Sequence, residues 1–297
     1  MTTSNAAPIR HYLPSGRIAW HAPLMLALVG GVGAAVLAAV YTLLIRYNPL
    51  IYISVFATIG FGALLGGVAQ RACKAGQSRS RAFNAFAGFA VGLLGLWLHW
   101  LMWTWLRVPD DGATARHLAA SGPGRWLDFL SFTAEHRHLS VGKFGSDGAE
   151  ESPTFMLWTW GFEAFTVLLL STLCASVSQT PFSERTMKWA VTDWKGEFAI
   201  DATTPLDRDQ LERRFQQEGV TWLAAMNANG RIVNDKSPGV RLLLECRSAP
   251  GDPACAFVSV TKVTQRGEKG KVTSPLTTNR LVDAASYQRL VRSLKNV

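Results

Sequence analysis

Two ionisable side chains lie inside stretches of sequence that are otherwise almost uncharged. His99 lies in the segment GLWLHWLMWTWLR, residues 95–107, and Glu163 is the single charge in the apolar stretch 155–177. A carboxylate in hydrocarbon is costly unless it has a partner, a proton or a water-filled cavity. A carboxylate and an imidazole in such a place could relay a proton, bind a cation, hold a polar ligand, or hydrogen-bond each other.

Helix geometry predicts that His99 and Glu163 lie at a similar depth. His99 precedes Leu106, the end of its apolar stretch, by seven residues, and Glu163 follows Phe155, the start of its own, by eight. With a rise of 1.5 Å per residue, both side chains lie roughly 10–12 Å below one surface of a bilayer. The sequence therefore predicts that His99 and Glu163 form an intramembrane polar pair that contacts directly.

Glycines mark the helix faces that are expected to pack. They recur three or four residues apart within two of the apolar stretches, at Gly62, Gly66, Gly88, Gly92 and Gly95. No hydrophobic force joins helices in lipid, so close backbone approach at small residues supplies the packing. His99 follows Gly95 by four residues and is expected to face the bundle interior. A glycine-lined pore is the alternative interpretation of the same pattern.

Four apolar stretches are long enough to carry these residues across a membrane. Each provides about the 20 helical residues that an apolar core of about 30 Å requires. They cover residues 24–45, 50–68, 82–106 and 155–177. The predicted fold is an α-helical membrane bundle of four transmembrane helices, in which the first stretch is retained rather than cleaved as a signal.

Tryptophans gather where the third stretch ends and the fourth begins. Trp103, Trp105, Trp158 and Trp160 lie there, and this placement is typical of an aromatic belt at one membrane face. Trp97 and Trp100 lie deeper, beside His99, and are expected to pack within the bundle.

Basic residues predict the orientation of the bundle. The N-terminal segment and the loop between the second and third stretches carry only basic charges: Arg10, Arg17, Arg71, Lys74, Arg79 and Arg81. The loop 107–152 carries five basic residues and seven acidic ones. Because basic loops stay in the cytoplasm, both termini are expected to be cytoplasmic and loop 107–152 to lie outside, in a bacterial inner membrane.

The chain is predicted to divide into a cytoplasmic tail over residues 1–22, a transmembrane domain over 23–178 and a cytoplasmic domain over 179–297. The last is a small α+β domain built around an antiparallel meander. Its predicted strands are 240–246, 255–263 and 271–282. One helix is expected to start at Thr204 and stop at Gly219, and a second to follow a cap at Asp283.

Two further segments carry weaker signals. In the outer loop, residues 125–132 predict a short surface helix, and the remainder is predicted to be irregular. Residues 179–198 are predicted to connect membrane and domain, with Trp189 and Trp194 beside lysines at the membrane interface.

Side chains that could bind metals occur without the spacing that such sites need. His117, Glu135, His136 and His138 gather in the outer loop, but a closed zinc site needs four ligands in a defined geometry. Cys246 and Cys255 flank a hairpin loop. Both are expected to be reduced thiols, and their role stays open. The sequence predicts no metal and no cofactor. It assigns no catalytic residue, since GEKGK at 267–271 lacks the upstream glycine and the hydroxyl of a phosphate loop.

The segment NPLIYISVFATIGFGALLGG, Asn48 to Gly67, precedes a basic loop and a glycine-rich stretch. In this it resembles a group of uncharacterised bacterial four-helix inner-membrane proteins with a cytoplasmic C-terminal domain. Some of those domains carry a CxxC-type knuckle, from which the wider spacing CRSAPGDPAC departs. The resemblance implies an architecture and no activity.

The preferred functional prediction is a non-enzymatic membrane adaptor or scaffold. Its expected partners are the lipid bilayer and a cytoplasmic protein bound through residues 179–297, and self-association stays open. Nucleic acid is not expected, because the net charge of +9 comes without a basic stripe interleaved with aromatics. One alternative is a small transporter or channel subunit that uses a buried layer of His99 and Glu163. A second alternative is a membrane-embedded enzyme.

Overall fold

The structure is a computed structural model that describes residues 11–47, 51–107, 112–121, 123–136, 153–176, 180–200, 207–220, 222–223, 239–265 and 271–295. The chain forms two compact units. One is the helical bundle, residues 15–178, and the other joins residues 1–14 to residues 179–297.

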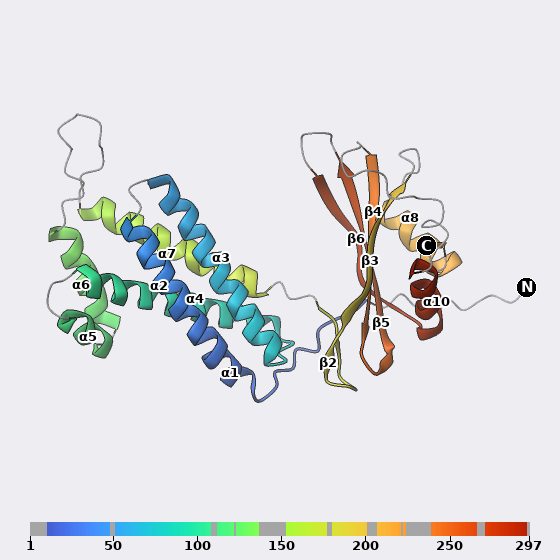
Figure 1. Cartoon of the computed structure of the whole chain (residues 1–297), viewed down its shortest axis with the longest axis horizontal. Helices are drawn as coiled ribbons and strands as arrows, with labels where there is room; N and C mark the ends of the chain where they lie inside the picture. The colour runs from blue at the N-terminus through green and yellow to red at the C-terminus, as the bar shows by residue number, and fades with distance from the viewer. Residues whose placement is uncertain are drawn as a thin grey trace, which may run out of the picture. The chain divides into compact units, whose positions relative to one another are not determined.

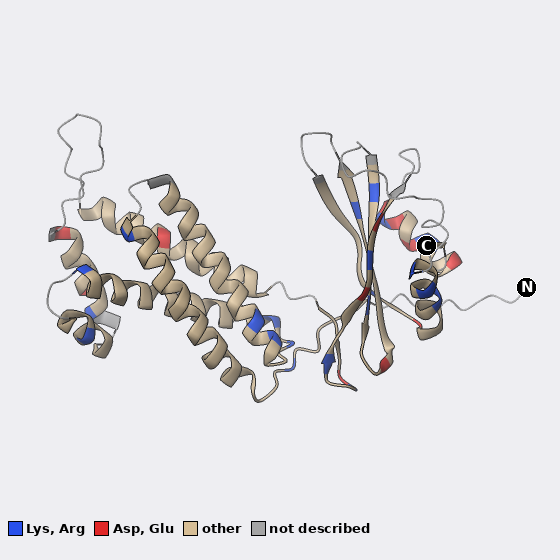
Figure 2. Ribbon diagram, viewed as in Figure 1, with Lys and Arg blue, Asp and Glu red and all other residues tan. Residues whose placement is uncertain are grey.

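In the described part of the bundle four helices are long and apolar enough to cross a membrane, which confirms the predicted number of long apolar helices. The first consists of α1 (Ala22–Met25), a π-helical turn η1 (Leu26–Gly30) and α2 (Gly31–Tyr47). The others are α3 (Ile51–Ala75), α4 (Arg81–Arg107) and α7 (Pro153–Ser176). They lie side by side in Figure 1, and charged residues are rare along their length in Figure 2.

Basic side chains lie at the C-terminal ends of three of these helices. Arg46, Lys74 and Arg107 lie in the last turns of α2, α3 and α4, where a cation favours the negative end of the helix dipole. Arg46 Nη1 also donates to the carbonyl oxygen of Leu106 at 2.6 Å. This bond satisfies an otherwise open carbonyl at the end of α4 and joins α2 to α4.

The loop after α4 contains more helix than the sequence predicts. The expected surface helix is present as α6 (Pro123–His136), with proline at its first position. A further helix, α5 (Ala113–Ala120), occupies part of the segment predicted to be irregular. Its first turn follows Gly112 at φ 77°, a left-handed conformation that glycine adopts without strain.

The second unit is built on a four-stranded antiparallel sheet with the order β3-β4-β5-β6. The strands are β3 (Val191–Ile200), β4 (Gly239–Ala249), β5 (Asp252–Gln265) and β6 (Lys271–Val282). A small hairpin of β1 (Phe182–Ser183) and β2 (Lys188–Trp189) precedes it. The predicted meander is therefore confirmed in β4, β5 and β6. The segment predicted as a connection instead forms the hairpin and the edge strand β3.

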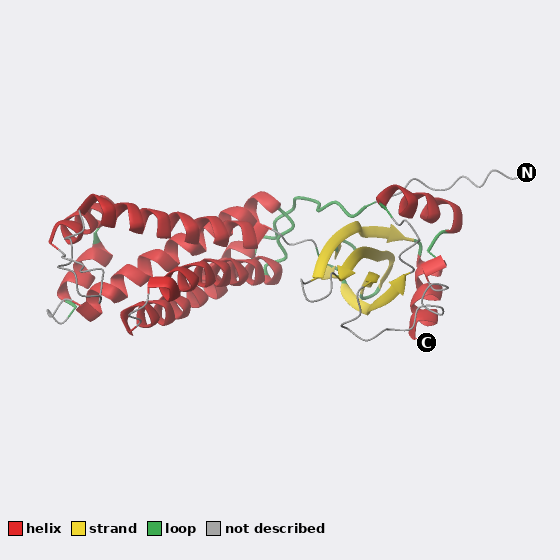
Figure 3. Cartoon of the chain, turned by 90° about the horizontal axis from the view of Figure 1, so that it is seen from above, coloured by secondary structure: helices red, strands yellow, loops and turns green. Residues whose placement is uncertain are grey.

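Two helices cover one face of this sheet, as Figure 3 shows from above. They are α8 (Arg208–Glu218) and α10 (Ala284–Lys295). Their buried side chains pack on those of the sheet in one core, which includes Leu211, Phe215, Leu244, Val258 and Leu290. Trp194, which the sequence predicts at a membrane interface, packs against this core and stacks on Phe198 at 5.6 Å.

The helix caps correct one prediction and confirm two. Helix α8 begins at Arg208 rather than Thr204, because Asp207 accepts from Gln210 N at 2.8 Å in a capping box. The helix ends at Gly219 as predicted. Asp283 caps α10 by accepting from Ser286 N at 2.9 Å.

Candidate functional site

A layer of polar side chains crosses the bundle near the end where α2 ends and α3 begins. Tyr41 of α2 is 3% exposed, and its hydroxyl donates to Glu163 Oε1 of α7. The same hydroxyl lies 2.8 Å from Thr58 Oγ1 of α3. The aromatic ring of Tyr41 is held by stacking on Phe61 at 4.3 Å. One tyrosine thus joins three helices and supplies a hydrogen-bond donor to the carboxylate.

His99 of α4 is the second part of the layer and is 5% exposed. Its Nδ1 lies 2.9 Å from Thr42 Oγ1 of α2. The Thr42 hydroxyl also lies within hydrogen-bond distance of the Ala38 carbonyl, at 2.7 Å. The tautomer of His99 decides which of the two side chains donates in the bond between them.

His99 and Glu163 lie in one layer, but they do not pair directly as the sequence predicts. Among the described residues, Glu163 is bonded to Tyr41 and His99 to Thr42, and no ion pair joins the two. Tyr41 contacts both, since its ring meets that of His99 edge-on at 4.8 Å. The residues that the sequence reasoning missed are Tyr41, Thr42 and Thr58.

Three glycines surround Ser171 on α7. A Cβ added to Gly92 would lie 2.3 Å from Ser171 Oγ, and one added to Gly88 would lie 2.4 Å from the Ser171 carbonyl oxygen. A Cβ on Gly66 would lie 2.7 Å from the same carbonyl. Helices α3 and α4 therefore approach α7 closely only because these positions have no side chain.

The remaining two glycines of the pattern are also at close contacts. A Cβ on Gly62 would lie 2.9 Å from the backbone of Val167, and one on Gly95 would lie 2.7 Å from the side chain of Leu65. Side chains and backbone thus fill the space beside all five glycines.

Aromatic side chains gather at the end of the bundle where α4 ends and α7 begins. Trp105 and Trp158 are largely exposed, as expected of side chains at a membrane boundary. Trp100 packs edge-on against Trp103 and Trp160 at 5.5 and 5.0 Å. Trp97 is 39% exposed and so faces outward from the bundle, which corrects its expected place in the interior.

Comparisons with protein-family models, with curated proteins and with solved structures find no match to this chain.

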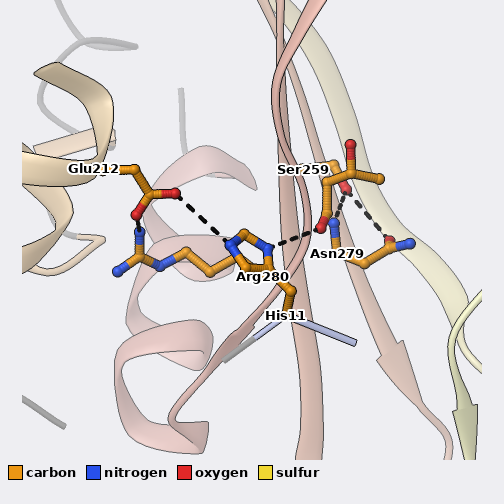
Figure 4. A network of polar contacts seen from close by, with 6 residues as sticks. His11, Glu212, Ser259, Asn279 and Arg280 are labelled. Atoms are coloured by element: carbon orange, nitrogen blue, oxygen red, sulfur yellow. Dashed lines mark hydrogen bonds and ion pairs between the residues drawn. The ribbon is translucent and has the colours of Figure 1, made fainter. Parts of the chain in front are cut away.

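The second unit binds a segment that precedes the first long helix. His11 forms an antiparallel bridge with Arg280 of β6. As Figure 4 shows, His11 Nε2 lies 3.8 Å from Glu212 Oε1, and Arg280 Nη1 donates to the other oxygen of that carboxylate at 2.9 Å. The guanidinium of Arg280 also lies over the ring of Phe215 at 4.1 Å. Burial lowers the pKa of Arg280, and the negative charge of Glu212 opposes that shift.

The next residue continues this contact. Tyr12 N donates to the Asn279 carbonyl at 3.0 Å, and the Tyr12 ring packs edge-on against Phe257 of β5 at 5.7 Å. Asn279 is at φ 48° in a bulge of β6, and its backbone N–H donates to Ser259 Oγ at 2.8 Å (Figure 4). Residues 11–12, predicted to belong to a separate N-terminal tail, are thus part of the C-terminal domain.

A cavity of about 350 Å³ opens between the tip of the β4–β5 hairpin and α10. Ser248 and Tyr287 line it, and both hydroxyls donate to Asp193 Oδ2 at 2.5 Å. Burial, together with the bond to Asp193 and its charge, raises the pKa of Tyr287. Tyr287 therefore stays neutral, and the three side chains form a closed hydrogen-bonded group rather than an activated nucleophile.

The two cysteines of the domain remain separate free thiols. Burial and the charges of Asp193 and Glu245 raise the pKa of Cys246 to about 12. Burial and a hydrogen bond to Asp252 raise the pKa of Cys255 to about 11. Both thiols are protonated near neutral pH, which disfavours metal binding and nucleophilic attack.

No metal-binding group occurs in the described part of the chain. His117 lies 3.2 Å from Arg125 Nη1 on the neighbouring helix. His138 lies outside the described residues, so the histidine cluster of the outer loop stays a hypothesis.

Proposed function

We propose that this chain is a four-span integral membrane protein that acts as a non-enzymatic adaptor, with its C-terminal domain presenting a binding surface to a cytoplasmic protein. The proposal includes a bacterial inner membrane as its location and cytoplasmic positions for both termini. It follows from the basic residues of the inner loops and from the way the domain is tied to the bundle.

One observation carries the proposal: residues 11–12 are built into the C-terminal domain. They precede the first long helix, whereas their partners Arg280, Asn279 and Phe257 follow the last. Backbone hydrogen bonds and ring contacts cannot form across a bilayer. These contacts support a placement of the segments before and after the bundle on one membrane side, with an even number of crossings between them. The chain therefore passes between the bundle and the C-terminal domain twice, before the first long helix and after the last.

The polar layer of the bundle supports a structural role over a transport role. Glu163 and His99 each hydrogen-bond a hydroxyl of another helix, which lowers the cost of their burial. The glycine faces beside them are filled by Ser171, Val167 and Leu65. Transport would instead require this layer to line water.

Reporter fusions test the topology on which the proposal rests. Fusions after residues 78, 140 and 290 are expected to report the inside, the outside and the inside of the cell. An outside signal at 290 would contradict the cytoplasmic domain and the proposed class of partner.

Photo-crosslinking from the full-length chain in its own membrane tests the adaptor role itself. A photoreactive residue at exposed positions of β6, Val272 or Leu281, is expected to give a discrete protein adduct, whereas one at the exposed bundle position Phe165 is not. Loss of cellular function in Glu163→Gln, with no adduct from the domain, would instead support the transporter.

A further inference from the structure

The β1–β2 hairpin of the C-terminal domain is short, rigidly held and carries exposed side chains. Ser183 Oγ donates to Asp252 Oδ2 at 2.5 Å, and the rings of Phe182 and Trp189 pack edge-on at 4.8 Å. These contacts bury Phe182 and Ser183 and fix the hairpin to β5. The predicted interfacial Trp189 is therefore used to hold the hairpin in place.

Two large hydrophobic side chains stay exposed beside these contacts. Met187 in the hairpin turn is 45% exposed, and Val191 at the start of β3 is 50% exposed. Met187 also has a φ of 54°, a conformation that costs a residue with a Cβ more than it costs glycine. Exposed Arg185 and Lys188 flank Met187, against the one acidic residue of the hairpin, Glu184.

The chain itself keeps this hairpin near the end of α7. Only residues 177–181 separate Ser176, the last residue of α7, from Phe182. Six Cα–Cα steps of extended chain span at most about 20 Å. If α7 crosses a membrane, the hairpin cannot leave the headgroup region and the water layer next to it.

We propose that the β1–β2 hairpin is a lipid-binding element. The proposal rests on the contacts that fix the hairpin to β5, the exposed Met187 and Val191, the flanking cations and the short connection to α7. It docks on the anionic headgroups of the membrane that the bundle spans, with Arg185 and Lys188 contacting the headgroups and Met187 and Val191 entering the interface. The inference rests on the proposed membrane insertion of the bundle and adds a contact that orients the domain.

The exposed basic residues at the same end of the bundle support this partner. Arg71, Lys74 and Arg81 lie at or near the junction of α3 and α4. Such residues attract anionic lipids to the leaflet from which the chain emerges after α7. The hairpin would therefore meet a surface already enriched in negative charge.

The test uses the full-length chain in nanodiscs of phosphatidylcholine, with or without phosphatidylglycerol, and lipids that carry a nitroxide quencher. A fluorophore is attached to Val191→Cys, with Val272→Cys as its matched control, because both are valines on strands and each is 50% exposed. Cys174 and Cys255, the two partly exposed native thiols, are replaced by serine. Quenching is expected at position 191 and not at 272, and more in discs that contain phosphatidylglycerol.

Variants of the hairpin then separate docking from folding. Arg185→Glu with Lys188→Glu should reduce quenching at position 191, since each basic side chain near an anionic surface changes the docking equilibrium by roughly fivefold. The same double charge reversal at Arg289 and Arg292, exposed on α10, should leave it unchanged.

The variant Met187→Gly relaxes the backbone at φ 54° and is expected to weaken docking while the domain remains at least as stable. A third label at Leu169→Cys, exposed on α7, separates failure of the hairpin from failure of the bundle. If Leu169 is quenched and Val191 is quenched no more than Val272, the lipid-binding element is refuted and membrane insertion stands. If Leu169 is not quenched, insertion and the lipid-binding element both fail.

Discussion

The strongest prediction concerns which residues of the polar layer are energetically coupled. Tyr41→Phe removes only the hydroxyl, because the phenylalanine ring can keep the stacking on Phe61 and the edge contact with His99. The change deletes the bonds to Glu163 and Thr58 and leaves the carboxylate without its donor. Hydrogen bonds between transmembrane helices average about 0.6 kcal/mol, so the loss of two should cost about 1 kcal/mol of unfolding free energy.

Double-mutant cycles locate the coupling. Tyr41→Phe combined with Glu163→Leu should lose less than the sum of the two, with an interaction energy of about 0.5–1.5 kcal/mol. His99→Leu combined with Glu163→Leu should show a smaller interaction energy than that pair, because no hydrogen bond or ion pair joins His99 to Glu163 and they share only the contact with Tyr41. Glu163→Gln keeps an acceptor for Tyr41 and serves as the tolerated control.

The assay is reversible unfolding of the full-length chain in mixed micelles of mild detergent and dodecyl sulfate, followed by circular dichroism. Each cycle compares four proteins under one set of conditions. A strong coupling of His99 to Glu163, together with additive losses for Tyr41 and Glu163, would refute the arrangement of the layer. The sequence-based pairing of His99 with Glu163 would then be correct.

Three further predictions concern packing, capping and acid stability. Gly92→Ala should destabilise the bundle, and Ser171→Ala should partly restore its stability, because the added Cβ clashes with Ser171 Oγ. In Gly88→Ala the added Cβ clashes with the Ser171 backbone, so Ser171→Ala should not restore stability. Thermal unfolding in detergent measures both effects. Asp207→Ala removes a capping box and should lower the unfolding free energy of the domain by about 1 kcal/mol in denaturant titrations of the whole chain. Hydrogen bonds to the Asp283 carboxylate lower the pKa of that group. The ionised carboxylate therefore stabilises the domain at pH values above the ordinary aspartate pKa near 4, and this stability is lost as the pH falls through the lowered pKa. Asp283→Asn should flatten that part of the curve of stability against pH.

The sequence predicts most of the fold because its strongest signals are local. The length of the apolar stretches predicts the four long helices. Runs of β-forming residues bounded by turn residues predict β4, β5 and β6. The edge strand β3 was missed because Lys188, Trp189, Trp194 and Lys195 together resemble an interfacial segment. Only the packing of Trp194 on Phe198 shows that the apolar side of this segment faces a protein core. Residues 11–12 were missed because a single isolated β-bridge has no periodicity to detect.

The partners of His99 and Glu163 show which part of a buried site a sequence can predict. Depth follows from one helix at a time: Tyr41 lies six residues from Tyr47, the end of α2, and Thr58 lies seven from Ile51, the start of α3. At 1.5 Å per residue these positions are about 9 and 10 Å deep, close to the depth predicted for His99 and Glu163. The same arithmetic could therefore have included both hydroxyls.

Direction around the helix axis is a different quantity, because it depends on the neighbours of each helix. Tyr41 and Thr42 are consecutive, so their side chains project about 100° apart, and α2 directs one toward Glu163 on α7 and the other toward His99 on α4. The order of helices around the bundle decides that α2 supplies both hydroxyls. A sequence thus restricts the partners of a buried charge to one layer, and the arrangement of the helices selects among the residues of that layer.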